Sequence, residues 1–407
     1  MSEVVNIPQL RFPEFNGGWK ESRIGKIYKD LRTGSTPSRA VKSYFKGDNP
    51  WITSGELKYN RISTTFEQIS DEAIKDTNLV LYQPGTLFIA ITGLEAPGTR
   101  GKCAINAVPS TTNQSCLAFR KVDSVDTIYM FYWYLKYGKP LYFKYAQGTK
   151  QQSFNNKIVE KFQIFLPNKP EQQKIAAFLS AVDNKIEQLS KKQELLGEYK
   201  KGLMQQIFSQ ATRFKADDGS NFPDWKERRL EEVANFQRGK NILEDKLGDK
   251  LLLGMGSVTE KGNLLINKNT SEQYITLLKN DLVMPERDIG RGLIIGRVAL
   301  IGQSDKYVLG ANILSLTINS DNSSRFLFQI INENNFRKKV RKIVSGSAQL
   351  MITSKDAKKL ALRLPVIEEQ QQIANFLSSI DNKIEQVGKQ LDESKQFKKA
   401  LLQQMFV

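Results

Sequence analysis

Apolar residues in two long segments of the chain, residues 171–208 and 369–406, recur at alternating spacings of four and three. A heptad pattern of this kind predicts two long α-helices, each with one apolar stripe along its side. An exposed stripe is unfavourable, so each helix needs a partner, and the other helix is the obvious one. A plain dimerisation coiled coil is the alternative. The predicted stripes include Ile175, Leu179, Val182, Ile186 and Leu189 in the first segment and Ile373, Leu377, Ile380, Ile384 and Val387 in the second.

These two segments are copies of one sequence. They align without a gap at an offset of 198 residues, and 21 of 38 positions are identical. A period this long indicates a duplicated domain rather than a solenoid repeat. Antiparallel helices in a pseudo-twofold molecule are the simplest arrangement. We therefore expect two similar domains, residues 1–167 and 211–366, and two helical segments, residues 168–210 and 367–407.

The segments between the helices alternate short β-type runs with glycine and proline turns. Each also contains an aromatic-rich run with helical periodicity. This mixture predicts two α+β domains whose middles differ in sequence. The expected strands are residues 86–93, 116–122, 293–302 and 313–319, and the expected helices are residues 128–137 and 325–343.

The chain is strongly basic, with 60 Lys and Arg against 43 Asp and Glu and a net charge of +17. The excess lies in residues 1–170 and 209–368, whereas the repeated helical segments are close to neutral. This distribution favours a polyanionic partner, with nucleic acid first, over a general effect on solubility.

Composition also excludes several kinds of site. The sequence has no histidine, which excludes His-dependent triads, His general bases and His metal ligands. The cysteines Cys103 and Cys116 are then too few for a zinc site, and we expect them to be reduced packing residues. The chain has neither a bilayer-spanning apolar run nor a signal-peptide pattern, so we expect a cytoplasmic protein.

Three short motifs imitate catalytic signatures and fail on inspection. Asp48-Asn49-Pro50-Trp51 is similar to an aminomethyltransferase motif but lacks its second proline, and it is better interpreted as a turn entering a strand. Gly101-Lys102 is a poor phosphate-binding loop because Ala96 and Cys103 replace the required glycine and hydroxyl. Asp183-Asn184-Lys185 lies in the heptad segment and recurs in its copy, which favours packing or docking over metal chemistry. We predict no active site.

Glycine-rich basic loops are the remaining candidate chemistry, with solvated surface turns as the alternative for each. Glycines let the backbone approach phosphate, and arginine can contact guanine in the major groove with two hydrogen bonds. One such loop runs over residues 92–102, and residues 287–292 hold the same place in the second domain. Residues 147–152 and 345–349 add amides that can bind adenine or phosphate.

The sequence resembles the specificity subunits of type I restriction–modification systems over essentially its whole length. The resemblance rests on the repeated Glu-Gln-Gln-(Lys/Gln)-Ile-Ala-x-Phe-Leu-Ser-x-(Val/Ile)-Asp-Asn-Lys-Ile-Glu-Gln and on a Leu-Pro just before each copy. Gly34-Ser35-Thr36-Pro37-Ser38, followed by residues 49–52, is also similar to the opening of such a domain. The second domain lacks this element and has Arg238-Gly239-Lys240 instead.

This resemblance implies two target-recognition domains separated by two antiparallel coiled-coil helices. Each domain would recognise half of a bipartite, asymmetric DNA site, and the helices would set the spacer and dock two methylation subunits. Two restriction subunits would join for cleavage. S-adenosylmethionine, ATP and Mg would belong to those partners, so this chain would be non-catalytic and hold no cofactor or metal.

The candidate DNA contacts follow from the loops and from the resemblance. A self-contained DNA methyltransferase and a basic coiled-coil scaffold are the competing functions; the first lacks a recognisable cofactor loop, and the second predicts binding without sequence preference. The candidates are Thr36, Arg39, Thr92, Arg100, Lys102, Lys150 and Gln151 in the first domain and Arg238, Lys240, Arg287, Arg291, Arg297 and Gln349 in the second.

Overall fold

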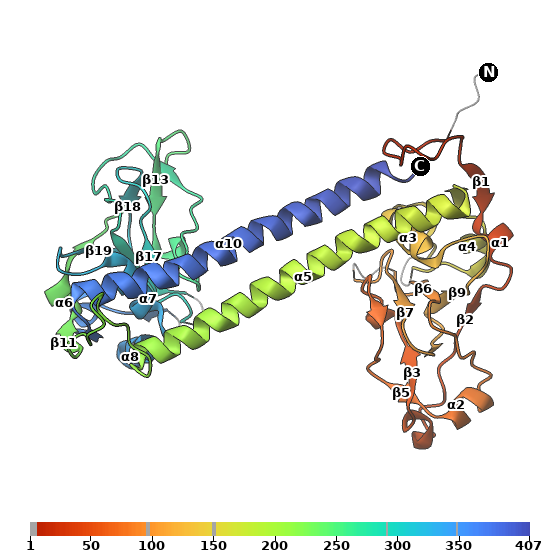
Figure 1. Cartoon of the computed structure of the whole chain (residues 1–407), viewed down its shortest axis with the longest axis horizontal. Helices are drawn as coiled ribbons and strands as arrows, with labels where there is room; N and C mark the ends of the chain where they lie inside the picture. The colour runs from red at the N-terminus through yellow and green to blue at the C-terminus, as the bar shows by residue number, and fades with distance from the viewer. Residues whose placement is uncertain (1–5, 95–97, 149–151, 290–291, 347–348) are drawn as a thin grey trace. The chain divides into compact units, whose positions relative to one another are not determined.

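The two predicted helices are present, as α5 (Lys169–Phe208) and α10 (Ile367–Gln404). This computed structural model describes residues 6–94, 98–148, 152–289, 292–346 and 349–407. The chain forms two units, unit 1 (Met1–Lys191 and Gly388–Val407) and unit 2 (Lys192–Val387), so each unit holds part of each helix (Figure 1).

Within each unit the two helices run antiparallel. In unit 1, Lys398 Nζ lies 2.6 Å from a carboxylate oxygen of Asp183. In unit 2, Lys200 Nζ lies 2.7 Å from a carboxylate oxygen of Asp381, the same pair at the repeat offset. Asp183 also accepts a hydrogen bond from Tyr132 Oη at 2.7 Å, so the Asp-Asn-Lys motif serves packing, as predicted. The ten predicted stripe residues are all buried or half-buried.

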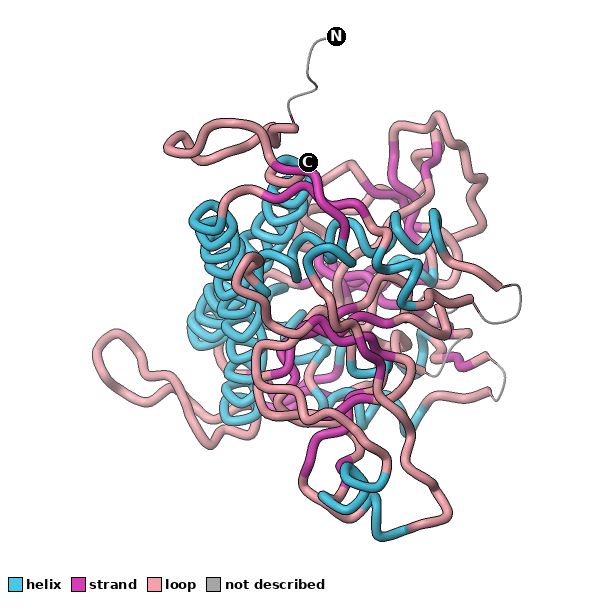
Figure 2. Tube along the Cα trace, turned by 90° about the vertical axis from the view of Figure 1, so that its right-hand side faces the viewer, coloured by secondary structure: helices cyan, strands magenta, loops and turns pink. Residues whose placement is uncertain are grey.

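Unit 1 is built on a five-stranded sheet in the order β2-β9-β6-β7-β4, beside a three-stranded sheet in the order β5-β3-β8. Long loops join these short strands (Figure 2). The first sheet comprises β2 (Arg32–Thr33), β9 (Cys116–Phe119), β6 (Leu87–Ala90), β7 (Cys103–Asn106) and β4 (Arg61–Ile62). The second comprises β5 (Gln68–Ile69), β3 (Asn49–Ile52) and β8 (Thr111–Thr112). A ribbon of β1 (Lys20–Arg23) and β10 (Gln163–Leu166) closes the unit; the helices are α1 (Ile24–Ile27), α2 (Asp71–Asp76), α3 (Thr127–Tyr145) and α4 (Asn156–Glu160).

Unit 2 repeats this topology, without a counterpart of β4 in its main sheet, although its sequence differs. Its main sheet has the order β12-β19-β15-β17, and its second sheet has the order β14-β13-β18. In both second sheets the central strand pairs antiparallel with one neighbour and parallel with the other. The strands are β12 (Ala234–Arg238), β19 (Ile313–Ile318), β15 (Leu282–Pro285), β17 (Ala299–Leu300), β14 (Asn269–Thr270), β13 (Lys250–Leu253) and β18 (Tyr307–Leu309). Unit 2 also has two ribbons, β11 (Lys226–Arg229) with β21 (Ala361–Leu364) and β16 (Arg287–Asp288) with β20 (Leu350–Met351). Its helices are α6 (Leu230–Val233), α7 (Ser324–Asn332), α8 (Asn334–Ile343) and α9 (Ser354–Lys359).

Most predicted elements are confirmed, and one is wrong. The runs at 86–93, 116–122 and 313–319 contain β6, β9 and β19. The predicted strand at 293–302 is reduced to Ala299–Leu300. Gly292 and Gly296 adopt left-handed φ angles of 73° and 64° there, which bends the chain out of an extended path. The predicted helix at 325–343 is split at Glu333, which caps α8.

A buried carboxylate near the start of each long helix explains the Glu-Gln-Gln repeat. In unit 1, Glu171 accepts hydrogen bonds from Arg11 Nε at 2.7 Å and from Trp19 Nε1 at 3.3 Å. In unit 2, Glu369 accepts from Arg213 Nη2 at 2.7 Å and from Trp225 Nε1 at 3.2 Å. These hydrogen bonds raise the pKa of both arginines. We name each trio a carboxylate clamp; it ties the segment that opens each unit to its helix.

The glutamine after each clamp carboxylate fixes a second segment. Gln172 Nε2 donates to Pro167 O at 3.0 Å, and its Oε1 accepts from Asp126 N at 2.9 Å. Gln370 makes the same two bonds, to Pro365 O at 2.9 Å and from Ser323 N at 2.9 Å. The Glu-Gln pair therefore holds both the opening segment and the first helix after the sheet.

Breaking the clamp of unit 2 is expected to destabilise that unit. Glu369→Ala removes a carboxylate that is fully buried, leaves Trp225 Nε1 without its acceptor and takes from Arg213 its buried ion-pair partner, at a cost of about 3 kcal/mol. Glu368→Ala changes the exposed neighbour and should cost less than about 0.5 kcal/mol. Urea unfolding of the two variants measures the difference; equal midpoints would show that the clamp is not stabilising.

No helix among the described residues is long and apolar enough to cross a membrane.

Candidate nucleic-acid interface

Three segments that are distant in sequence meet at one edge of the main sheet in unit 1. The segment after β2 is held by Gly34 N, which donates to Asn113 O at 3.1 Å. The loop after β6 begins at Ile91, whose N donates to Ser115 O at 2.9 Å. The segment 147–154 joins them, because Phe154 N donates to Ile91 O at 2.8 Å. We call this the loop edge of unit 1; it brings the candidate loops 92–102 and 147–152 together.

Unit 2 has the same loop edge with different side chains. Gly239 N donates to Ile313 O at 3.1 Å, and Glu286 N donates to Asn312 O at 3.0 Å. Ile352 N then donates to Glu286 O at 2.9 Å, and β16 pairs with β20. The bridges Gln147–Ser153 and Ser345–Met351 are counterparts at the repeat offset. Both candidate loops of unit 2 therefore also lie side by side.

A glycine marks the start of each loop edge. A Cβ on Gly34 would lie 1.5 Å from Thr112 O, and one on Gly239 would lie 1.6 Å from Gly310 O. Both positions therefore require glycine. Arg238-Gly239-Lys240 thus occupies the place of Thr33-Gly34-Ser35, which agrees with the position predicted for it in the second domain.

The candidate residues of unit 1 differ in how firmly they are held. Arg100 Nε donates to Leu94 O at 2.9 Å, and its guanidinium lies 4.9 Å from the ring of Tyr142, so this side chain positions the loop. Lys102 Nζ lies 4.2 Å from the ring of Tyr59. Thr92 is half-buried in the same loop, whereas Lys150 and Gln151 lie outside the described residues.

Thr36 and Arg39 lie on the segment that follows Gly34. Thr36 Oγ1 donates to Gln114 Oε1 at 2.7 Å, beside the start of the loop edge. Arg39 forms two hydrogen bonds with Glu67, at 2.5 and 2.7 Å, and its guanidinium lies 4.4 Å from the ring of Phe45. Both terminal nitrogens of the Arg39 guanidinium therefore already donate hydrogen bonds to the carboxylate of Glu67.

In unit 2 the candidate cations have different partners, and one of them contacts the buried carboxylate of Glu286. Arg238 is exposed, and its Nε donates to Glu286 Oε2 at 2.8 Å. Lys240 Nζ lies 4.2 Å from the ring of Tyr274. Arg287 Nη1 lies 3.5 Å from Oε1 of the exposed Gln349, a weak contact. Arg291 lies outside the described residues.

Both units match one protein family. Residues 16–196 and 223–394 each match the type I restriction modification DNA specificity domain. The chain belongs to this family. It is a DNA specificity component of a type I restriction–modification system, and the basic loop edges lie within its two specificity domains.

Relatives of these specificity domains cover most of the chain. The type I restriction enzyme MjaVIII specificity subunit of Methanocaldococcus jannaschii is 25% identical over 97% of this chain and 92% of its own. The MjaIX specificity subunit of the same organism is 30% identical over 55% and 56%. A crystal structure of the S subunit from M. genitalium shares the fold, with a TM-score of 0.64, 16% identity, and 98% of this chain and 99% of that chain covered.

Sequence reasoning missed one residue that shapes the second specificity domain. Arg337 is buried, and its guanidinium donates to the carbonyls of Ile295 and, at 3.3 Å, Gly292. Burial, then the charges of Arg297 and Arg341, lowers its pKa to about 10. Arg337 thus holds the inner side of the loop at 292–297, where a strand was predicted. The only signal in the sequence was its place in the basic run at 337–342.

Arg297 faces the same inner side rather than the loop tip. Its Nη1 donates to Asn332 O at 2.7 Å, and burial, followed by the charge of Arg341, lowers its pKa. Its position therefore links the loop to helices α7 and α8.

Proposed function

We propose that each specificity domain recognises one half of a bipartite, asymmetric site on double-stranded DNA through its loop edge. One observation carries this proposal: both units present the same three-segment edge on the same sheet topology, with different side chains. Different side chains on equivalent backbones present different donors and acceptors to base edges. The net charge of +17 supplies the sequence-independent attraction to phosphate.

We also propose that the chain is non-catalytic and directs two methylation and two restriction subunits to this site. Its relatives are named specificity subunits, and the clamps and stripe residues recur in both long helices, whereas the loop edges of the two units carry different side chains. S-adenosylmethionine, ATP and Mg would be bound by those partners. Because its target is DNA, we place the chain in the cytoplasm.

Methylome sequencing of the host with and without this gene tests the proposal. The expected result is the loss of adenine methylation at one bipartite, asymmetric motif when the gene is removed. An unchanged methylome would contradict the recognition role. Methyl transfer by the pure chain alone would instead overturn its non-catalytic assignment.

We further propose that α5 and α10 set the spacer between the two half-sites. Inserting four residues near Gln193 in α5 alone shifts the apolar stripe by a stutter. We expect the spacer of the methylated motif to change or methylation to be lost. The same insertion in the exposed turn at Asp218-Gly219 is the control and should leave the motif unchanged. An unchanged spacer in the α5 variant would count against this role of the helices.

A further inference from the structure

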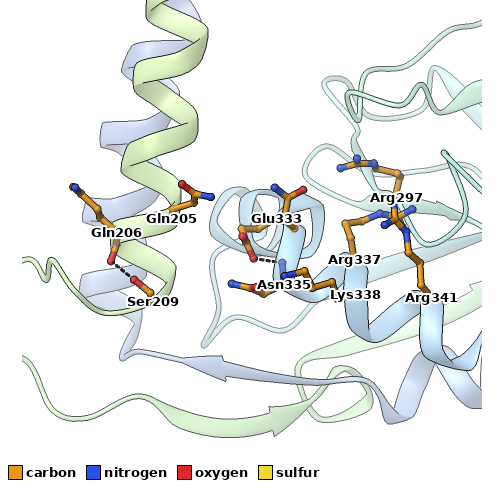
Figure 3. Close-up of a pocket in the computed structure, with 10 residues that line it drawn as sticks. Gln205, Gln206, Ser209, Arg297, Glu333, Asn335, Arg337, Lys338 and Arg341 are labelled. Atoms are coloured by element: carbon orange, nitrogen blue, oxygen red, sulfur yellow. Dashed lines mark hydrogen bonds between the residues drawn. The ribbon is translucent and has the colours of Figure 1, made fainter.

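A cavity of about 480 Å³ lies in unit 2 between the end of α5 and helix α8. Figure 3 shows Arg297, Arg337 and Arg341 gathered on one side of this pocket. On the other side lie Gln205 and Gln206, which belong to the last turn of α5, and Ser209, which follows it. The pocket therefore combines charged donors with amide and hydroxyl groups.

The charge of this pocket is one-sided. Four cationic side chains line it, those of Arg297, Arg337, Lys338 and Arg341, against the single carboxylate of Glu333. Glu333 already accepts a hydrogen bond from Asn335 N at 2.6 Å as the cap of α8. Burial and mutual repulsion lower the pKa of Arg337 and of Arg297. Such repulsion is relieved when an anion lies between the cations.

Two donors of this cluster lack an acceptor. Arg297 Nε and Arg337 Nε are buried and have no hydrogen-bond partner within the described part of the chain. Arg337 is 3% exposed, so water does not replace the missing partner freely. Buried charged N–H groups are ordinarily paired, and the unpaired ones therefore indicate a site for an acceptor.

The topology that the two units share does not require these arginines, although Arg337 and Arg297 hold the loop at 292–297 in unit 2. Counting back from the bridges Ser345–Met351 and Gln147–Ser153, Arg337 and Arg341 correspond to Lys139 and Phe143 of unit 1, which are both exposed. The pocket at the end of α10 in unit 1 is lined mainly by aromatic and aliphatic side chains such as Trp133 and Leu141. Packing of the shared topology therefore does not account for the cationic lining of this pocket.

We propose that the arginine pocket of unit 2 binds a phosphate group, either a phosphodiester of the DNA backbone or a free phosphate. Guanidinium groups bind tetrahedral oxyanions through several parallel N–H donors, and the glutamine amides and the Ser209 hydroxyl complete the shell. The DNA form rests on the proposed function, because the pocket borders the loop at 292–297. The free-phosphate form is independent of it.

Thermal unfolding of the full chain tests phosphate binding directly. Inorganic phosphate should raise the midpoint relative to sodium chloride at equal ionic strength, because a ligand bound only by the folded state stabilises it. Arg341→Gln and Lys338→Gln remove exposed pocket cations without opening a core cavity and should abolish this increase. Lys342→Gln removes an exposed cation of the same helix outside the pocket and should retain it.

DNA binding at several salt concentrations identifies the source of the phosphate. If DNA supplies the phosphate, each pocket variant makes the negative slope of log K against log salt shallower by about one, and Lys342→Gln does not. If a free phosphate is the ligand, thermal stabilisation is lost in the pocket variants while the slope stays unchanged. The proposal is overturned if phosphate gives no stabilisation and the slope is unchanged, or if Lys342→Gln behaves like the pocket variants. A wild-type chain without sequence preference would instead contradict the proposed function alone.

Discussion

Replacing Gly239 by alanine is expected to abolish recognition of one half-site and leave the other intact. The new Cβ would lie 1.6 Å from Gly310 O, so the segment after β12 must move away from the strand it contacts. All three segments of this loop edge are held by backbone hydrogen bonds, and the displacement therefore changes the whole surface. Losing contacts to a few base pairs, each contributing about 1–3 kcal/mol, should weaken binding on the order of 100-fold or more.

Sequencing of fragments selected from a random double-stranded DNA library measures this effect. The wild-type chain should select both half-sites, Gly239→Ala only one, and Gly34→Ala only the other. Gly256→Ala is the matched control in unit 2, since a Cβ there meets no atom within 4 Å. Gly55→Ala serves unit 1, where the nearest atom, Thr53 Oγ1, is 3.7 Å away. Weakening of both half-sites by either variant would contradict independent recognition by the two units.

Alkaline pH is expected to unfold unit 1 before unit 2. Burial raises the pKa of Cys116 to about 12, that of Tyr137 to about 12, and that of Cys103 as well. The tyrosines Tyr28, Tyr129, Tyr132 and Tyr134, whose pKa values burial also raises, belong to the same unit. In unit 2 burial lowers the pKa of Arg337 to about 10, which is the opposite sign.

The direction follows from proton linkage. Below about pH 9 the two thiols are protonated in both the folded and the unfolded states, so their titration does not reduce the free energy of unfolding. Above that pH only the unfolded state ionises, so the free energy of unfolding falls by about 1.4 kcal/mol per pH unit for each thiol. The two thiols alone therefore remove about 5 kcal/mol by pH 11. The titration of Arg337 has the opposite effect. Its pKa is lowered in the folded state, so the free energy of unfolding rises once the folded state loses this proton.

Pulse proteolysis at rising pH, with cleavage sites mapped by mass spectrometry, separates the two units. Cuts should appear first within residues 20–166. A Cys103→Ala, Cys116→Ala variant is the control for the thiols and should show a shallower loss of stability with pH. Simultaneous cleavage of both units, or unit 2 first, would contradict the prediction.

The helical segments could be predicted because their signal is local and periodic. A stripe at heptad spacing specifies a helix and a buried face, and the partner was available as a copy in the same sequence. The clamps have two signals in the sequence, the repeated Glu-Gln-Gln and a short match of Trp19-Lys20-Glu21 with Trp225-Lys226-Glu227. Their acceptors, Glu171 and Glu369, lie 152 and 144 residues away, and no sequence pattern specifies such contacts.

The sequence predicted which residues form the loop edges, but it did not predict the backbone contacts that hold them. Glycines and cations identified residues 92–102 and 287–292, and the structure brings each loop beside its glutamine-containing partner segment. The place of Gly239 was predicted from the sequence, whereas the close backbone approach that requires glycine at both positions was not. The strand predicted at 293–302 failed because the buried Arg337 takes carbonyl groups, those of Ile295 and Gly292, that lie 42 and 45 residues before it and that a sheet would have used.

The ribbon of β1 with β10 in unit 1 and that of β11 with β21 in unit 2 have a consequence for recombination of this gene. In unit 2, Lys226 lies opposite Leu364 and Arg229 opposite Ala361, so the intervening chain leaves and returns at one place. Lys20 opposite Leu166 does the same in unit 1. The clamp residues lie outside both intervals. Recombination with crossovers in the two strands of one ribbon can therefore exchange the whole interval between those strands and keep both carboxylate clamps. We expect such an exchange to change the DNA target of one domain in a single event while the clamps to the long helices remain.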